Sequence, residues 1–208
     1  MDDKASAVFD VTDKNTDPIN LFKKWYDTAQ EAGVVNADSM MVATVKSDAT
    51  LSARIVSLQG FDEKGFRFST NYNSVKAKEL ELNPNVALVF FWNLIQRSVR
   101  VEGTVEKFSD EESDNCFNKL PPSLKFGVHV GENQSSVIAS REMLVKRVAT
   151  LTQELAGKEI TRPSFLGGYT VKPHRFEFWK GQKDWMTDRI LFIKKSGLPG
   201  WTIQRLEP

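Results

Sequence analysis

The side chains that most often perform nucleophilic or metal chemistry are scarce in this sequence. Cys116 is its one cysteine, and His129 and His174 are its two histidines, so neither a disulfide framework nor a zinc site of the usual spacing can be assembled. A lone cysteine on an expected helix is usually a small core residue. The glycine-rich phosphate loop and the G-x-S-x-G, H-E-x-x-H and C-x-x-C signatures are also absent. Any chemistry must therefore come from other groups.

Two cationic side chains, Arg54 and Lys76, have properties that suit an anion. Arg54 lies on an expected strand, and its guanidinium fork matches a dianion well. Lys76 lies near the start of an expected helix, whose positive end would attract the same kind of ligand. Each also has a plain interpretation, Arg54 as a solvated edge residue and Lys76 as a surface lysine. The two residues alone leave both interpretations open.

The first half of the chain combines one helix with a series of strands. Asp17 is a candidate N-cap before Pro18, and the apolar residues that follow lie on one helical face: Ile19, Phe22, Tyr26 and Ala29. Residues 39–108 contain β-rich runs separated by turn-formers: MMVATV, SARIVSL, GFRFSTN, NVALVFFW and SVRVEGTVEKF. We predict consecutive antiparallel strands there, interrupted by one helix in SVKAKELELNP.

The second half is helical before it returns to strands. Ser109 followed by Glu112 is a capping-box signature, and it predicts a helix that Pro121-Pro122 stops. A second helix is predicted over about 140–155 from apolar residues at helical spacing: Leu144, Val148, Leu151 and Leu155. The runs FLGGYTV, RFEFWKG, RILFIKK and WTIQRL predict strands whose partners must be the earlier ones. The fold class is therefore mainly β with helices (α+β), with helices packed around one barrel-like sheet.

Composition favours one compact domain. The chain has 208 residues, of which 40% are hydrophobic. Residues 1–16 are polar and predict a flexible tail, which leaves residues 17–208 as the domain. With 28 basic and 27 acidic residues interspersed, nucleic acid is not an expected partner. The acidic N-terminus and the lack of a long apolar run argue against a signal peptide and a membrane span, so we expect a cytoplasmic protein.

Short phrases spread along most of the chain resemble the pyridoxine/pyridoxamine 5'-phosphate oxidases, in the same order. They are SARIV (52–56), GFRFSTN (65–71), SVKAKEL (74–80), NP (83–84), VRVEG (99–103), QSS (134–136), FLGGY (165–169), EFW (177–179), DR (188–189) and RLEP (205–208). The resemblance implies an antiparallel, Greek-key-like split β-barrel that binds FMN and forms a homodimer, with the flavin between the subunits. It also implies a small-molecule substrate and no resident metal.

The resemblance assigns a set of residues to the cofactor. Arg54 and Lys76 would reach the FMN phosphate, and Gln134 and Ser135 would contact FMN from the second subunit. The residues that would line the flavin or lie near its ring are Ile55, Val56, Ser57, Ser69, Thr70, Trp179 and Arg189. Two positions depart from the family: Val75 replaces a phosphate-binding arginine, and Ser98 replaces a glutamine that faces the ring. Loss of these contacts predicts weaker FMN binding, by roughly 10²- to 10³-fold.

The substrate positions depart further. Where the family has side chains that hold the substrate phosphate and pyridine ring, this chain has Gln59, Cys116, Leu120, Leu124, Trp185 and Thr187. Ser123 is an alternative to Leu124, because the alignment shifts by one residue there. Lys119 or Lys125, from the same segment, is the alternative source of positive charge.

Two hypotheses follow from this pattern. In the first, the protein is an FMN-dependent oxidoreductase with weakened or altered specificity. In the second, it is a non-catalytic paralogue that binds FMN or another ligand. Conserving most cofactor positions while changing the substrate positions favours the first, because complete decay would damage both sets alike.

Overall fold

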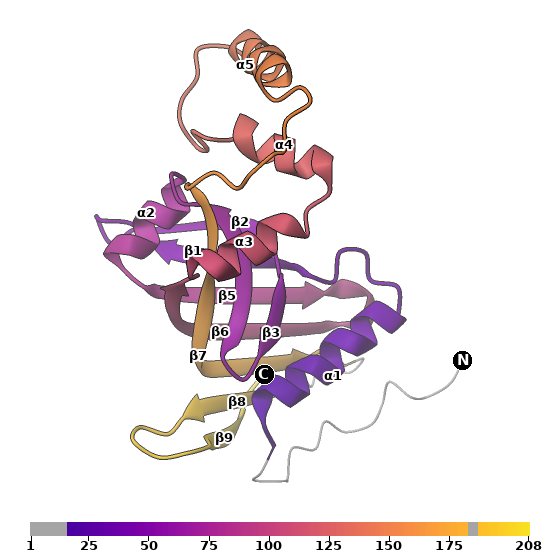
Figure 1. The fold of residues 1–208 in the computed structure, drawn as a ribbon. Helices are drawn as coiled ribbons and strands as arrows, with labels where there is room; N and C mark the ends of the chain where they lie inside the picture. The colour runs from indigo at the N-terminus through magenta and orange to yellow at the C-terminus, as the bar shows by residue number, and fades with distance from the viewer. Residues whose placement is uncertain (1–15, 183–186) are drawn as a thin grey trace.

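The computed structural model describes residues 16–182 and 187–208, and its main feature is a curled antiparallel sheet (Figure 1). The strand order is β2-β1-β5-β6-β7-β4-β3, with β8 paired to β7 and β9 paired to β8. The strands are β1 (Ser39–Val45), β2 (Leu51–Ser57), β3 (Gly60–Asp62), β4 (Gly65–Asn71), β5 (Asn85–Trp92), β6 (Arg97–Lys107), β7 (Leu166–Lys180), β8 (Asp188–Lys194) and β9 (Trp201–Leu206). The mainly β architecture with helices is confirmed.

Strand β7 joins the two parts of the sheet. Its first residues pair with β4, its last residues pair with β8, and β6 follows it along most of its length. The prediction of separate strands in FLGGYTV and RFEFWKG was therefore wrong, because pairing with β6 resumes after an irregularity between Pro173 and Arg175 and carries one strand through both runs. The short strand β3 was not predicted. Strand β9 pairs with β8 rather than with the earlier strands.

The glycine pair Gly167-Gly168 allows β7 to approach β4 closely. A Cβ atom on Gly167 would lie 2.2 Å from the Tyr72 hydroxyl oxygen, and one on Gly168 would lie 2.4 Å from the Phe68 carbonyl oxygen. The Tyr72 hydroxyl donates to the Gly168 carbonyl and accepts from the Gly168 N–H, both at 3.0 Å. A side chain at position 167 would displace the Tyr72 ring, and one at position 168 would clash with the backbone of β4, so the close approach accounts for the glycines.

The helices are α1 (Pro18–Glu31), α2 (Val75–Leu82), α3 (Asp110–Asn118), α4 (Pro122–Val130) and α5 (Arg141–Glu154), with a short 3₁₀ turn η1 (Asn93–Ile95). The Asp17 side chain caps α1 by accepting from the N–H groups of Ile19 and Asn20, at 2.8 and 3.1 Å. The buried face of α1 contains Trp25, which was not predicted, while Tyr26 is only half-buried. Trp25 is buried because it packs edge-on against Phe178 of β7, with centroids 5.2 Å apart.

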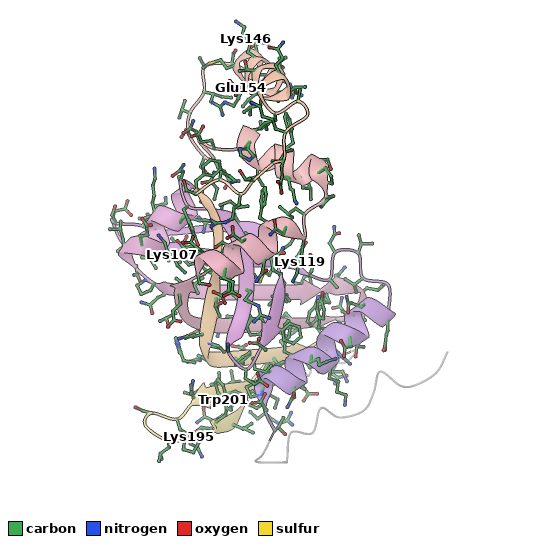
Figure 2. All side chains as sticks on the ribbon, in the orientation of Figure 1. Lys107, Lys119, Lys146, Glu154, Lys195 and Trp201 are labelled. Atoms are coloured by element: carbon green, nitrogen blue, oxygen red, sulfur yellow. The ribbon has the colours of Figure 1, made fainter. Side chains whose placement is uncertain are left out.

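Helices α3 to α5 follow β6. The capping box of α3 is present: the Ser109 hydroxyl accepts from the Glu112 N–H, and the Glu112 carboxylate accepts from the Ser109 N–H. The sequence predicted that Pro121-Pro122 ends a helix, and α3 does end just before them. Pro122 also begins α4, because proline suits the first turn of a helix. Helices α4 and α5 project away from the sheet, and Lys146 and Glu154 lie on α5 (Figures 1 and 2).

The core lies between the inner face of the sheet and α1. It is rich in fully buried aromatic side chains, among them Phe22, Phe66, Phe90, Phe176 and Phe178. Within the described residues, no helix is long and apolar enough to cross a membrane.

Candidate functional site

Side-chain alternation divides the candidate residues between the two faces of the sheet. On β1, Val42 is buried on the inner face, and its cross-strand partner on β2 is Arg54. On the outer face, Ser98 of β6 pairs with Trp179 of β7, which pairs with Arg189 of β8. Cross-strand partners lie on the same face. Arg54 therefore lies on the inner face, and the other three residues lie on the outer face.

The guanidinium group of Arg54 is held in a polar network between β1, β2 and α2. One terminal nitrogen, Nη1, donates to Thr44 Oγ1 at 2.5 Å and to the Val42 carbonyl at 3.3 Å. The other, Nη2, donates to Ser52 Oγ at 2.6 Å and to Glu79 Oε2 at 3.0 Å. Both terminal nitrogens are thus already engaged within the chain. Glu79 is the buried counter-charge, with a side chain that is only 7% exposed.

Lys76 is the less committed cation of this cluster. Among the described residues, the hydrogen-bond contacts of its Nζ atom are long, 3.4 Å to Ser74 Oγ and 3.4 Å to Gln134 Oε1. Burial lowers the pKa of Lys76, and repulsion from Arg54 lowers it further, while Glu79 partly offsets both. Lys76 also lies in the first turn of α2, whose N-cap is Ser74. Two adjacent cations at a helix N-terminus form an arrangement that an anion would stabilise.

The segment after α4 reaches this cluster. The side-chain amide of Asn71 donates to the carbonyls of Gly131 and Glu132, at 2.7 and 2.9 Å. This anchor places Gln134 beside Lys76 of the same chain, whereas the resemblance implied a contribution from the second subunit. The next residue, Ser135, has a φ of 73°, a left-handed conformation that is uncommon for residues other than glycine.

The remaining cofactor candidates differ in burial. Ile55 and Ser57 are exposed on the outer face, while Val56 is half-buried on the inner face. On β4, Ser69 is half-buried, and Thr70 is buried with no hydrogen-bond partner for its hydroxyl among the described residues. Val75, at the first position of α2, is exposed. An unpaired buried hydroxyl costs free energy unless a ligand or water satisfies it.

The outer face contains a hollow of about 380 Å³. Its lining residues come from β5 to β8 and the C-terminal end of the described chain: Phe91, Ser98, Glu177, Trp179, Arg189 and Pro208. The structure thus brings together Ser98, Trp179 and Arg189. A half-buried tryptophan beside an exposed phenylalanine and a guanidinium group offers flat apolar surface and hydrogen-bond donors to an aromatic ligand.

None of the described residues at the substrate positions lines this hollow. Gln59 follows β2 and is exposed, and Thr187 is half-buried just before β8. Cys116 is half-buried on α3, Leu120 is half-buried between α3 and α4, and Leu124 is 56% exposed on α4. Trp185 lies outside the described residues.

The two alternative lysines differ in position. Lys125 lies with Nζ 5.3 Å from the centroid of the Phe117 ring, in a separate hollow of about 420 Å³ that Arg162 also lines. Lys119 is exposed at the C-terminal end of α3 (Figure 2). The ammonium group of Lys125 on α4 therefore lies next to Phe117 of α3.

Several side chains of the Arg54 cluster and of the outer-face hollow were not predicted from the sequence. Thr44, Ser52 and Glu79 hold Arg54, and Glu177 holds Arg189 with contacts of 2.7 and 3.0 Å. The one local signal was Ser74, because serine before a helical run is a typical N-cap. The others depend on strand pairing and helix docking, which adjacent residues do not reveal.

Comparison with known proteins identifies the family of the chain. The sequence model described as "Pyridoxamine 5'-phosphate oxidase" matches residues 27–154, and "Pyridoxine 5'-phosphate oxidase C-terminal dimerisation region" matches residues 167–208. A pyridoxine/pyridoxamine 5'-phosphate oxidase of Rubrobacter xylanophilus is 44% identical over 92% of this chain and 87% of its own length. One from Microcystis aeruginosa is 41% identical over 95% of this chain and 91% of its own.

Solved structures share the fold. PhzG from Burkholderia lata, in complex with tetrahydrophenazine-1-carboxylic acid, is 26% identical with a TM-score of 0.86, over 94% of this chain and 95% of that one. A pyridoxamine 5'-phosphate oxidase-related, FMN-binding protein from Nostoc punctiforme is 14% identical with a TM-score of 0.73, over 94% of this chain and 100% of that one. The curled sheet and the matched regions define an oxidoreductase of the split-barrel class. The chain belongs to the pyridoxine/pyridoxamine 5'-phosphate oxidase family.

Proposed function

We propose that this protein is an FMN-dependent oxidoreductase, active as a homodimer, whose substrate site has a weakened or altered specificity. A single observation carries the cofactor assignment: Lys76, whose pKa is lowered by burial, lies beside Arg54 at the N-terminal end of α2. The hollow with Trp179 and Arg189 supports the same assignment. We further propose that residues 17–208 form one domain.

The inner-face cluster suits the FMN phosphate. Lys76 supplies a positive charge whose hydrogen-bond contacts among the described residues are as long as 3.4 Å, Ser74 supplies a helix N-cap, and Gln134 closes the site from the side. Arg54 has a supporting role in this proposal, since Glu79, Thr44 and Ser52 already occupy its terminal nitrogens. The Thr70 hydroxyl, which has no hydrogen-bond partner among the described residues, supports the presence of a ligand near the C-terminal end of β4. These residues therefore fit the group.

The outer hollow suits the flavin ring, and its position favours a dimer. Arg54 and Trp179 lie on opposite faces of the sheet, and Lys76 lies near Arg54 on α2, so one chain does not present both sets to the same flavin. A second chain that covers the outer face would bring them together. That face carries exposed apolar side chains, namely Met41 (43%), Leu51 (73%), Ile55 (63%) and Phe91 (57%). An apolar patch of this kind favours association, in agreement with the dimerisation region matched at residues 167–208.

When bound, FMN supplies the redox chemistry by accepting a hydride from the substrate. The chain's own residues bind and orient: Lys76 holds the phosphate, Trp179 provides a flat surface, and Arg189 donates hydrogen bonds. No titratable side chain of the described hollow is free to act as a base, because both oxygens of Glu177 accept from arginines.

The substrate proposed here carries less negative charge than pyridoxine 5'-phosphate. Gln59, Leu120 and Leu124 stand where family members hold the substrate phosphate, and none is cationic. Lys125, the alternative source of charge, lies over the Phe117 ring, which supports the proposal of a less anionic substrate. A charge-assisted hydrogen bond contributes about 1.5–3 kcal/mol, so the loss of several lowers affinity for a phosphorylated substrate strongly.

The first test is a titration of the purified protein with FMN, followed by anaerobic addition of pyridoxine 5'-phosphate and, separately, of unphosphorylated pyridoxine. We expect the flavin to bind and to lose its absorbance slowly with the phosphorylated compound. Absence of FMN binding would contradict the cofactor proposal. Rapid and complete bleaching by pyridoxine 5'-phosphate would contradict the proposal of altered specificity.

A substitution of Lys76 tests the phosphate site directly. Lys76→Met is expected to raise the Kd for FMN by about 10- to 10²-fold, because a charge-assisted contact of about 1.5–3 kcal/mol is lost. The Kd for riboflavin, which lacks the phosphate, is expected to change little. Lys78→Met, two residues further along α2 and exposed, is the matched control. Equal weakening of FMN and riboflavin would place Lys76 outside the phosphate site.

A further inference from the structure

The guanidinium group of Arg189 is fixed from two sides. Its Nε and Nη2 atoms both donate to Glu177 Oε1, at 3.0 and 2.7 Å. Its Nη1 atom donates to the backbone carbonyl of Glu207, at 3.0 Å. The Arg189 side chain is 31% exposed and that of Glu177 is 11% exposed. Arg189 therefore presents its remaining N–H groups to the hollow from a fixed plane.

Glu177 is fixed in turn by Arg100. The second carboxylate oxygen, Oε2, accepts from Arg100 Nη2 at 2.6 Å, and the two residues are direct cross-strand partners on β6 and β7. Arg100 also lies 3.4 Å from Glu102. The result is a chain of charges, Arg100–Glu177–Arg189, across three strands. Since each oxygen of Glu177 has an arginine partner, this carboxylate is suited to holding a side chain rather than to moving a proton.

We propose that Glu177 is a positioning residue for the flavin site: its carboxylate fixes Arg189 toward the ring of a flavin bound in the hollow and sets the local charge there. This inference rests on the proposed function, because it assigns the hollow to the flavin ring. An arginine held in place loses less conformational entropy when its ligand binds, so prior fixing strengthens binding. The carboxylate also keeps a negative charge beside the ring.

The substitution Glu177→Gln preserves the shape of the side chain but removes its charge. It is expected to lower the affinity for oxidised FMN and to raise the midpoint potential of the bound flavin. Binding of oxidised FMN is expected to weaken by about tenfold, since Arg189 is no longer fixed. The midpoint potential of the bound flavin is expected to rise, because the reduced flavin carries more negative charge and no longer faces the carboxylate. If reduced flavin gains tenfold in affinity relative to oxidised flavin, the two-electron potential rises by about 30 mV.

The experiment measures the FMN Kd and the midpoint potential of the flavin-loaded dimer for the wild type, Glu177→Gln, Arg189→Met and the double variant. In the Arg189→Met background, Glu177→Gln is expected to weaken FMN binding no further, since the two residues act as one unit. Glu106→Gln is the matched control, because Glu106 lies on β6 in an ion pair with Lys172, away from the hollow. It is expected to change neither quantity.

The outcomes separate this inference from the proposed function. A wild-type protein that takes up no FMN overturns the proposed function and this inference with it. A wild type that binds FMN, together with a Glu177→Gln variant of unchanged Kd and unchanged potential, overturns the inference alone. So does additive weakening in the double variant. If Glu177→Gln does not fold, Arg189→Lys leaves the Arg100–Glu177 pair intact and loses the two-nitrogen contact to Glu177 Oε1, and an unchanged Kd in that variant overturns the inference.

Discussion

Pyridoxine 5'-phosphate and unphosphorylated pyridoxine are expected to reduce the bound flavin with kcat/KM values within about tenfold of each other. An enzyme that held the substrate phosphate by three charge-assisted contacts would favour the phosphorylated compound by ~10³-fold or more, at about 1.5–3 kcal/mol for each contact. This chain has Gln59, Leu120 and Leu124 at those positions, and none carries a positive charge. Stopped-flow measurement of flavin absorbance under anaerobic conditions gives both values.

A gain of charge tests the same argument. Leu120→Arg is expected to shift the preference toward the phosphorylated compound by roughly 10-fold, because Leu120 is half-buried between α3 and α4, where an arginine would be partly shielded from water. Leu198→Arg adds the same charge in the exposed β8–β9 connection and is the control. A native protein that already prefers pyridoxine 5'-phosphate by 10²-fold or more would show that another side chain supplies the charge.

The substitution Phe22→Ala is expected to lower the free energy of unfolding by about 3–5 kcal/mol. Phe22 of α1 is 0% exposed. Its ring makes edge contacts, with centroids 4.8 Å apart, to Phe61, Phe66 and Phe90. Truncation would leave a cavity that these rigid rings cannot fill. Urea unfolding at one fixed protein concentration measures the effect, since association shifts the apparent stability of a dimer.

Lys24→Ala, an exposed position on the same helix, controls for the change in helix composition. It is expected to alter the free energy of unfolding by no more than about 0.5 kcal/mol. A loss below about 1 kcal/mol in Phe22→Ala would contradict the packing of α1 against the sheet.

Local patterns were sufficient for most helices and strands. The Asp17 cap, the Ser109–Glu112 capping box and the apolar spacing around Leu151 each depend on residues a few positions apart, and the structure has helices α1, α3 and α5 there. The extent of β7 was predicted wrongly because a long neighbour, β6, determines it. The start of α4 was missed because proline both stops one helix and begins another.

The sequence by itself determined the family, the mainly β fold and the identity of the cofactor candidates, because these depend on the order of residues along the chain. Only the tertiary structure decided which candidates share a face. Strand register places Arg54 on the inner face and Trp179 on the outer face, and the docking of α2 brings Glu79 to Arg54. These are long-range contacts, and their partners are chosen by the packing of the whole sheet rather than by neighbouring residues.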